Sequence, residues 1–346
     1  MLPCEYTENQ LVRYEQFDNW EPRNADGKYG GVYSMEGALS HSVNTTTVQI
    51  ALKAGVDSIR YLARDLGVMG ELPLGPAIAL GTGNVSLMDM LQVYGTYANR
   101  GVRPELFYLD RIETADGRTI VAFKRPNPDE FERVINEDHA DMMIQMMRSV
   151  VDSGTARALR YRYGLYGEFA GKTGTTQNQS DGWFIGYNPK LVAGVWVGNE
   201  NPHIHFKTMR YGQGSASALP IWGRFMQKVV KDPDYKYIKR TKFVPMRDTV
   251  AAMMQCPPYL EEMPVFVDLE EEDFWDILEF QEEMEALEPR TRDSLIRTYP
   301  RRSNETLSEY SRRIKKHNDR LDRKRRRQEN RKEYWNERLF GNKRKN

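Results

Sequence analysis

The sequence predicts an α+β domain in which an antiparallel sheet is flanked by helices. Apolar residues at helical spacing, as in Ala140, Ile144 and Met147, alternate along the chain with runs of strand formers. Three of these runs follow one another across short turns and indicate neighbouring antiparallel strands: Gly171–Thr176, Gly182–Tyr187 and Leu191–Gly198. At 346 residues the chain can bury a core and form one large or two ordinary domains.

The first half of the chain contains helices with recognisable ends. A helix is expected from about Met35 to His41, with a break at Ser42-Val43-Asn44. Helical apolar spacing then resumes and stops at Gly55. Ser86-x-x-Asp89 is typical of a capping box and predicts the start of a further helix.

The following segments predict a hairpin and two more helices. Asp116-Gly117 lies between two runs of strand formers and indicates a β-hairpin. Asn136 is a suitable helix N-cap, and Pro220 is expected to open a later helix. The residues of that later helix expected to face inward are Ile221, Trp222, Phe225, Met226 and Val229.

Charge divides the chain into three expected parts. Residues 1–240 hold the mixed helices and strands, as a partial domain. Residues 241–300 form a linker and an acidic segment, with thirteen Asp and Glu and no Lys or Arg between Glu261 and Glu288. Residues 301–346 have eighteen Lys and Arg against seven Asp and Glu, which predicts a basic helical or disordered tail. The chain shows no signal peptide and no transmembrane run, so any export or anchoring signal is expected elsewhere.

Composition and spacing favour no metal site and no cofactor. His203 and His205 have no acidic or cysteine partner nearby in the sequence, which favours a surface loop. Cys4 and Cys256 can form one disulfide or remain two free thiols, and the sequence leaves both alternatives open. The basic run at Arg323–Arg327 favours a solvated helix or tail, so no nucleic acid partner is expected.

The stretch Gly171–Thr176 has the chemistry of a carboxylate-binding strand. Lys172 and the hydroxyls of Thr173 and Thr175 can face an anion, and Gly174 lets another extended backbone approach. An alternative is an edge strand with a solvated lysine. A phosphate-binding loop is disfavoured, because that pattern needs glycine where the chain has Tyr166.

Ser42-Val43-Asn44 lies at the predicted break between two helices. Serine and asparagine are both common at helix caps, which is a sufficient structural explanation. The functional alternative is a hydroxyl that relays a proton, next to an amide that orients a peptide substrate.

The two stretches together resemble a known family. Ser42-x-Asn44 followed by Lys172-Thr173-Gly174-Thr175 is similar to two of the three motifs of penicillin-binding proteins and serine β-lactamases. The resemblance covers residues 1–230 and, within the family, is greatest to the class A (bifunctional) penicillin-binding proteins. It also rests on Pro22–Asn24, Tyr29–Gly31, Gly37–Asn44, Ala79–Gly81, Tyr97–Gly101, Val150–Ala156, Ser180–Tyr187 and Val195–Gly198.

The resemblance implies a D,D-transpeptidase that cross-links peptidoglycan stem peptides through an acyl-enzyme. Ser42 would relay protons, Asn44 would bond the substrate or the general-base lysine, and Lys172 would raise the local potential. Thr173 and Thr175 would bind the terminal carboxylate, and the strand at Gly174–Thr175 would pair with the stem peptide. β-Lactams would bind as mimics of that peptide, and other cell-wall synthesis proteins are possible partners.

The chain departs from the family pattern in one respect. No serine here is followed three positions later by lysine, so the motif that supplies nucleophile and base is absent. We expect that motif, with the nucleophile helix, the first two strands, a glycosyltransferase domain and a membrane anchor, to lie before Met1. A sheet edge and an apolar helix face should then be uncovered, and the chain alone should be inactive.

Three hypotheses follow from the sequence. The chain is a truncated transpeptidase domain, located in the parent protein at the periplasmic face of the cell membrane. Alternatively, it is a non-catalytic peptidoglycan-binding or scaffolding remnant, or one half of a split enzyme whose other polypeptide carries the missing helix.

Overall fold

The computed structural model describes residues 3–263 together with Arg312, Arg313 and Lys316. The chain divides into two compact units, Met1–Pro264 and Val265–Asn346. Residues 241–263 lie in this first unit, and the domain boundary at residue 240 stays a prediction. Apart from the three residues named, the predicted basic tail lies outside the described residues, as does the acidic segment beyond Met263.

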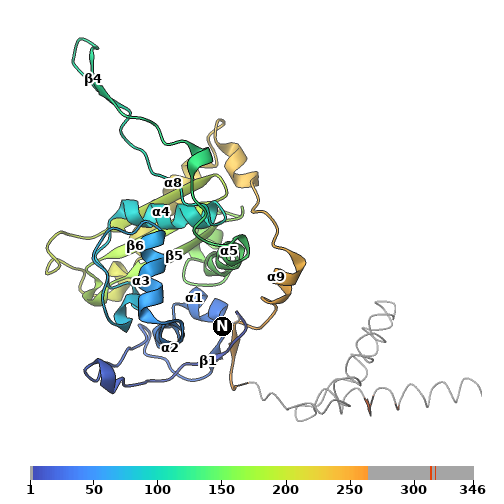
Figure 1. Ribbon diagram of the computed structural model, residues 1–346. Coiled ribbons are helices and arrows are strands. Elements are labelled where there is room, and N and C mark those ends of the chain that lie inside the picture. Colours follow the sequence, from blue (N-terminus) through green and yellow to red (C-terminus); the bar gives the residue numbers. More distant parts are fainter. Residues whose placement is uncertain (1–2, 264–311, 314–315, 317–346) are drawn as a thin grey trace, which may run out of the picture. The chain divides into compact units, whose positions relative to one another are not determined.

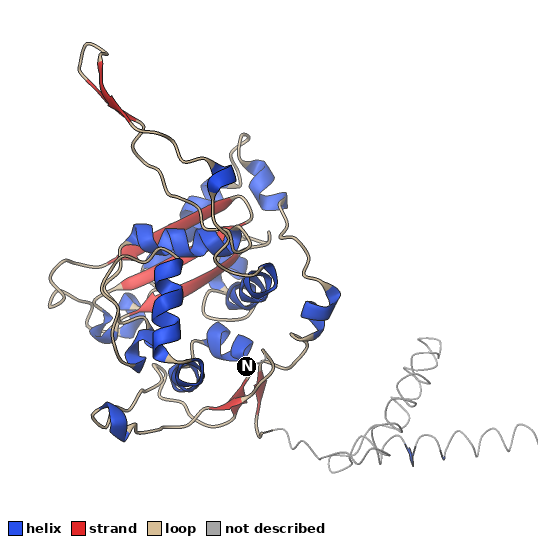
Figure 2. Ribbon diagram, in the orientation of Figure 1, coloured by secondary structure: helices blue, strands red, loops and turns tan. Residues whose placement is uncertain are grey.

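A three-stranded antiparallel sheet lies at the centre of the first unit, as the sequence predicted. Its strands β5 (Ala170–Thr175), β6 (Gly182–Asn188) and β7 (Leu191–Val197) lie side by side in chain order. Helices α4 (Leu87–Ala98) and α5 (Glu137–Asp152) cover one face, and α8 (Ala218–Val229) covers the other (Figure 1). The fold is thus the predicted α+β arrangement of helices around an antiparallel sheet, as Figure 2 also shows.

Alternating side chains of β6 pack against the two helical layers. The ring of Phe184 meets Trp222 of α8 with centroids 5.1 Å apart, and the Trp222 indole N–H donates to the Ala193 carbonyl at 2.9 Å. On the opposite face, the ring of Tyr187 lies edge-on to Tyr94 of α4 at 6.0 Å. Because β6 is covered on both sides, it is the most deeply buried strand of the sheet.

Helix α8 buries only part of its predicted inner face. Trp222 and Met226 are buried, but Ile221 is 52% exposed and Phe225 is 45% exposed. The expectation that these two residues face inward was wrong, because the helix contacts the sheet along a narrower stripe. Strand β7 pairs with β6 alone among the described residues, so its other edge is open. Within the part of the chain that the structure describes, this helix face and this sheet edge have no covering element.

The remaining elements surround this core. Capping at Ser86 and Asn136 is confirmed, as is the hairpin at Asp116-Gly117, which projects from the body with every strand residue exposed (Figure 1). The other helices are α1 (Met35–His41), α2 (Asn44–Ala54), α3 (Val56–Asp65), α6 (Ala158–Tyr161), α7 (Met209–Gly212) and α9 (Asp248–Ala252), and the hairpin strands are β3 (Arg111–Glu113) and β4 (Thr119–Ala122). Short 3-10 helices lie at Glu15–Phe17, Pro76–Leu80, Pro128–Glu130, Gln177–Gln179 and Lys236–Arg240. None of the helices in the described residues has the length and apolar character needed to cross a membrane.

A second small sheet joins the two ends of the first unit. Strand β2 (Val32–Tyr33) pairs with β1 (Thr7–Glu8) on one side and with β8 (Tyr259–Leu260) on the other. Beside it, Cys4 and Cys256 form a disulfide, which decides between the two alternatives left open by the sequence. The Tyr6 hydroxyl also donates to the Pro257 carbonyl at 2.7 Å. Residues 253–260 are therefore held against the N-terminal segment both covalently and by hydrogen bonds.

Removing the disulfide should destabilise this unit. The two cysteines are 252 positions apart, so the cross-link restricts the unfolded chain over nearly the whole unit. Cys4→Ser combined with Cys256→Ser should lower the free energy of unfolding by about 2–5 kcal/mol. Thermal melting under oxidising conditions measures the loss, and a dithiol should lower the melting temperature of the parent chain only. Equal stability of the two proteins without reductant would contradict this contribution.

Candidate active site

Ser42 lies where α1 ends, in a backbone conformation that is unusual for its residue type. Its φ of 57° and ψ of 49° are in the left-handed region, where a side chain with a Cβ costs roughly 1 kcal/mol or more. This turn reverses the chain between α1 and α2, and the Ser42 side chain is left exposed. The helix break predicted at this position is therefore confirmed, and it presents a hydroxyl to solvent.

Lys172 comes from β5 and meets this hydroxyl across 130 positions of sequence. Its Nζ donates to the Ser42 Oγ at 3.0 Å and to the backbone carbonyl of Thr173 at 3.0 Å. Desolvation by the surrounding protein disfavours the charged form and lowers the pKa of Lys172 to about 8. A lysine titrating this close to neutrality has two accessible protonation states, as acid–base chemistry requires.

Asn44 is the first residue of α2 and is held on the side of the N-terminal segment. Its amide nitrogen donates to the Arg23 carbonyl at 2.8 Å. Next to it, the Thr45 backbone N–H donates to the side-chain oxygen of buried Asn24 at 3.2 Å. These bonds fix the start of α2 and so the position of Ser42. The structure places Asn44 close to Ser42 in the chain, with one of the two N–H donors of its side-chain amide bonded to Arg23.

The hydroxyls of Thr173 and Thr175 both have partners within the chain. The oxygen of Thr173 lies 2.8 Å from the hydroxyl oxygen of Thr155, and Thr175 accepts from the Gly214 backbone N–H at 3.0 Å. In the Thr155–Thr173 pair, one hydroxyl donates its proton to the oxygen of the other. The second hydroxyl keeps its proton for another acceptor. Thr175 acts as acceptor towards Gly214, so its own proton is also available. One hydroxyl of the Thr155–Thr173 pair and the hydroxyl of Thr175 can therefore each still donate one hydrogen bond to an anion.

Gly174 packs its backbone close to the neighbouring strand and loop. A Cβ added there would lie 3.1 Å from the Cβ of Trp183, and one added at Gly214 would lie 2.3 Å from the Gly174 carbonyl oxygen. Glycine at position 214 therefore lets the loop before α8 lie directly on β5, and glycine at position 174 lets β5 lie close to the Trp183 side chain of β6. That contact is what brings the Gly214 N–H to Thr175.

Two residues near this strand, Thr155 and Gly214, were not predicted from the sequence. Thr155 belongs to the loop after α5, and its backbone N–H donates to the Ser40 carbonyl at 3.1 Å. Gly154 lies against the same carbonyl, since an added Cβ would be 2.3 Å from it. The loop thus connects the end of α1 to β5. The stretch Val150–Ala156, which resembles the family, could have indicated this loop from the sequence. Nothing in the sequence indicated Gly214.

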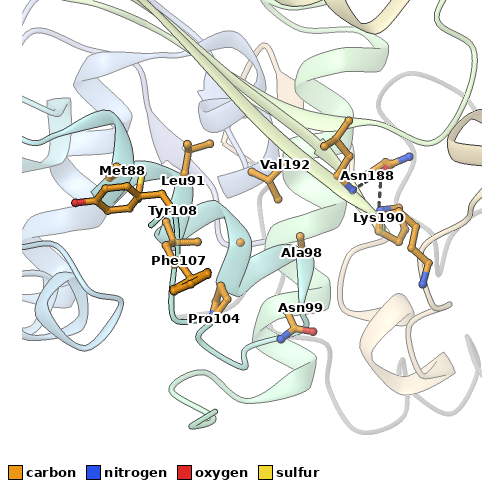
Figure 3. Close-up of a pocket in the computed structure, with 14 residues that line it drawn as sticks. Met88, Leu91, Ala98, Asn99, Pro104, Phe107, Tyr108, Asn188, Lys190 and Val192 are labelled. Carbon is orange, nitrogen blue, oxygen red and sulfur yellow. Dashed lines mark hydrogen bonds between the residues drawn. The ribbon is translucent and has the colours of Figure 1, made fainter. Parts of the chain in front are cut away.

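A separate apolar pocket of about 410 Å³ opens between α4, the 104–108 segment and the β6–β7 turn (Figure 3). Asn188 closes one end, where its side-chain oxygen accepts from the backbone N–H groups of Lys190 and Leu191 at 2.9 Å each. The pocket is lined by none of the predicted site residues. Within the described residues, no group of three or more His, Cys, Asp or Glu side chains is placed to hold a metal ion.

Comparison with known proteins decides the family. The model for "Penicillin binding protein transpeptidase domain" matches residues 4–227, which is more than half of the chain. The chain belongs to the penicillin-binding protein transpeptidase family.

Relatives and solved structures agree with this membership. Penicillin-binding protein 1A of Neisseria lactamica is 34% identical over 224 residues, which cover 64% of this chain and 27% of that protein. Its counterpart in Aquifex aeolicus is 32% identical over 214 residues, covering 62% and 28%. The chain thus spans about a quarter of the length of these curated bacterial relatives.

Two solved structures confirm the fold. The crystal structure of penicillin-binding protein 1A from Haemophilus influenzae matches with a TM-score of 0.56 at 18% identity, covering 67% of this chain and 39% of that one. PonA1 from Mycobacterium tuberculosis, solved in complex with penicillin V, matches with a TM-score of 0.54 at 23% identity, covering 67% and 64%. The penicillin-binding transpeptidase fold predicted from the sequence is thereby confirmed.

The lowered pKa of Lys172 should make the free energy of unfolding depend on pH. A lysine whose pKa is lower in the folded state binds fewer protons there than in the unfolded chain between about pH 8 and its ordinary value of 10.5. Stability therefore rises with pH across this window, and below pH 8 the penalty for the partly desolvated ammonium group is fully present. Lys172→Met should remove this rise and stabilise the protein at pH 7.

Chemical denaturation of both proteins between pH 7 and pH 10.5 measures the difference. Lys190→Met, which changes an exposed lysine in the β6–β7 turn, is the matched control and should retain the rise. A parent chain and a Lys172→Met variant with the same pH dependence would show that Lys172 is not desolvated by folding.

Proposed function

We propose that this chain supplies the peptide-binding wall of a class A peptidoglycan D,D-transpeptidase. The observation that carries the proposal is the contact of Lys172 with Ser42, which joins the two family motifs into one site. Next to it, one hydroxyl of the Thr155–Thr173 pair and the hydroxyl of Thr175 each retain a hydrogen-bond donor for a carboxylate. A cation, two hydroxyls and a sheet edge suit a stem peptide that ends in a free carboxylate.

The free edge of β5 suits an extended peptide. This strand pairs with β6 alone among the described residues, so alternate residues direct their backbone N–H and C=O groups away from the sheet. The Thr173 carbonyl accepts from the Lys172 side chain, and the proposal places Thr173, and by alternation Thr175, at the free edge. A peptide can add to these groups as a further strand. β-Lactams would compete for the same groups as mimics of that peptide.

The proposal assigns recognition to this chain and the attack to another serine. In the family the nucleophile and base come from a serine-x-x-lysine motif, and these 346 residues contain none. The acylated serine would come from a segment outside the present sequence, joined to it or carried by a separate polypeptide. Ser42 would then relay a proton to the leaving amine and Asn44 would orient the substrate.

The same absence favours a second candidate, a non-catalytic peptidoglycan-binding or scaffolding protein. It predicts peptide binding that is never followed by acylation, even when serine-x-x-lysine segments are supplied. Both candidates place the chain at the periplasmic face of the cell membrane. The disulfide between Cys4 and Cys256 supports that location, because disulfides persist in oxidising compartments.

Peptide binding by the chain itself tests recognition. An acylated peptide ending in D-Ala-D-Ala should shift the NMR signals of β5, while its C-terminal amide and its L-Ala-L-Ala isomer should not. Thr175→Val should weaken binding roughly tenfold or more, because a hydrogen bond to a charged group is lost, and Thr175→Ser should restore it. Thr119→Val, an exposed strand threonine of the hairpin, is the control. Equal binding of acid and amide would contradict the proposal.

A further inference from the structure

The indole of Trp183 lies beside the bare backbone of Gly174. In the β5–β6 ladder Gly174 pairs with Trp183 and Lys172 pairs with Ile185, so these four residues share the face of the sheet that α4 contacts. A Cβ built at Gly174 would lie 3.1 Å from the Cβ of Trp183, 3.7 Å from its Cγ and 3.9 Å from its Cδ1. The ring therefore begins where a side chain at position 174 would stand.

Contacts on the side away from β5 hold the Trp183 ring in place. Its centroid lies 6.3 Å from that of Trp196, the residue opposite it on β7. The Trp196 Nε1–H donates to one carboxylate oxygen of Asp181 at 2.8 Å. The other oxygen of this carboxylate accepts from the hydroxyls of Thr176 at 3.0 Å and Ser180 at 2.9 Å. Because these bonds join β7 to the turn between β5 and β6, the aromatic pair is fixed relative to β5.

A peptide strand added to the free edge of β5 would meet this ring. Neighbouring strands lie about 4.8 Å apart, and successive side chains of a strand point to opposite faces of the sheet. The added strand therefore directs every second side chain onto the face that carries Trp183. Where such a side chain comes next to Gly174, no β5 side chain separates it from the indole, and the two meet above the glycine.

We propose that Trp183 is a specificity-determining residue for the peptide, and that its indole admits only a small apolar side chain, such as a methyl group, next to Gly174. This inference rests on the proposed function, since it takes a peptide strand on the free edge of β5 as given. It adds a contact that involves neither the Ser42–Lys172 pair nor the hydroxyls assigned to the carboxylate.

The size limit follows from the narrow space above Gly174. Even a Cβ on β5 itself would be 3.1 Å from the Trp183 Cβ, which is closer than carbon atoms normally pack. A methyl group from the peptide side can pack against the edge of this space. A leucine side chain extends two bonds further and presses on the indole, which cannot yield without losing its packing on Trp196. Overpacking of this kind weakens binding about tenfold or more.

Dissociation constants for three acylated peptides, ending in D-Ala-D-Ala, D-Leu-D-Ala and D-Ala-D-Leu, test the size limit. In the parent chain leucine should weaken binding at least tenfold at the position next to Gly174. Trp183→Ala should remove about tenfold of that penalty. The penalty at the other position should stay, because successive side chains point to opposite faces. Relief of the penalty at both positions, or at neither, would overturn the proposal.

The methyl NMR signals of the D-Ala-D-Ala peptide report the contact directly. A methyl group beside an indole feels the ring current, so one of the two methyl shifts on binding should differ between the parent chain and Trp183→Ala. Trp183→Phe retains a smaller ring and a native-like contact with β5, so it should relieve the leucine penalty only about threefold. Melting temperatures verify that both variants fold. Tyr108→Ala, which removes an 85% exposed ring, is the control and should match the parent. Identical methyl shifts in parent and Trp183→Ala would contradict the contact.

The same titrations separate this inference from the proposed function. If the D-Ala-D-Ala acid binds no better than its C-terminal amide, β5 does not recognise a carboxylate, and the proposed function and this inference both fail. If the acid is preferred but Trp183→Ala leaves both leucine penalties unchanged, the proposed function stands and this inference alone fails. In that case Trp183 only covers the glycine backbone of its neighbouring strand, as aromatic residues do elsewhere in sheets.

Discussion

The packing of α5 against both α1 and β5 is the contact on which the site depends. Ala140, Val150 and Val151 of α5 are fully buried, so the helix is held by the core on both sides. In the last turn of α5, the Ser149 hydroxyl donates to the carboxylate of Glu36 in α1. At its C-terminal end, the loop through Gly154 lies on the last turn of α1. Through α5, burial of apolar surface sets the distance between Ser42 and Lys172.

The position of Lys172 next to Ser42 costs folding free energy. Its ammonium group is desolvated, which opposes folding, and the hydrogen bonds to Ser42 and to the Thr173 carbonyl offset only part of the loss. The large apolar core around Trp222, Phe184 and Phe169 compensates elsewhere in the fold. A lysine of lowered pKa and a serine in a strained conformation thus share one site. Both features reduce stability locally.

The segment after α8 returns to the beginning of the chain and encloses the helix that carries Ser42. Residues 253–260 add strand β8 to the small sheet, and the Pro258 carbonyl accepts from the Ser34 backbone N–H at 3.2 Å at the start of α1. Gly37 lies directly against that carbonyl, since an added Cβ would be 1.8 Å from it. The disulfide fixes this segment covalently. Sequence well beyond the KTGT strand therefore supports the opposite wall of the site.

Much of the local structure could be predicted from the sequence, because its causes lie within a few residues. The capping box at Ser86, the cap at Asn136 and the turn at Asp116-Gly117 act on their immediate neighbours, and alternating apolar residues identify β6 and β7. The two motif stretches were recognised in the same way. Their roles in peptide binding and proton relay stay predictions, as do the domain boundaries.

The tertiary structure decided what depends on contacts far apart in the chain. Only the packing of α5 brings Ser42 to Lys172, and only the return of residues 253–260 pairs Cys4 with Cys256. The periodicity of α8 could not distinguish buried Trp222 from exposed Phe225, because a helix does not encode where its neighbours end. Residue types and their order thus determined the family, the fold class and the chemistry available. Packing determined which of these groups meet and how readily Lys172 releases a proton.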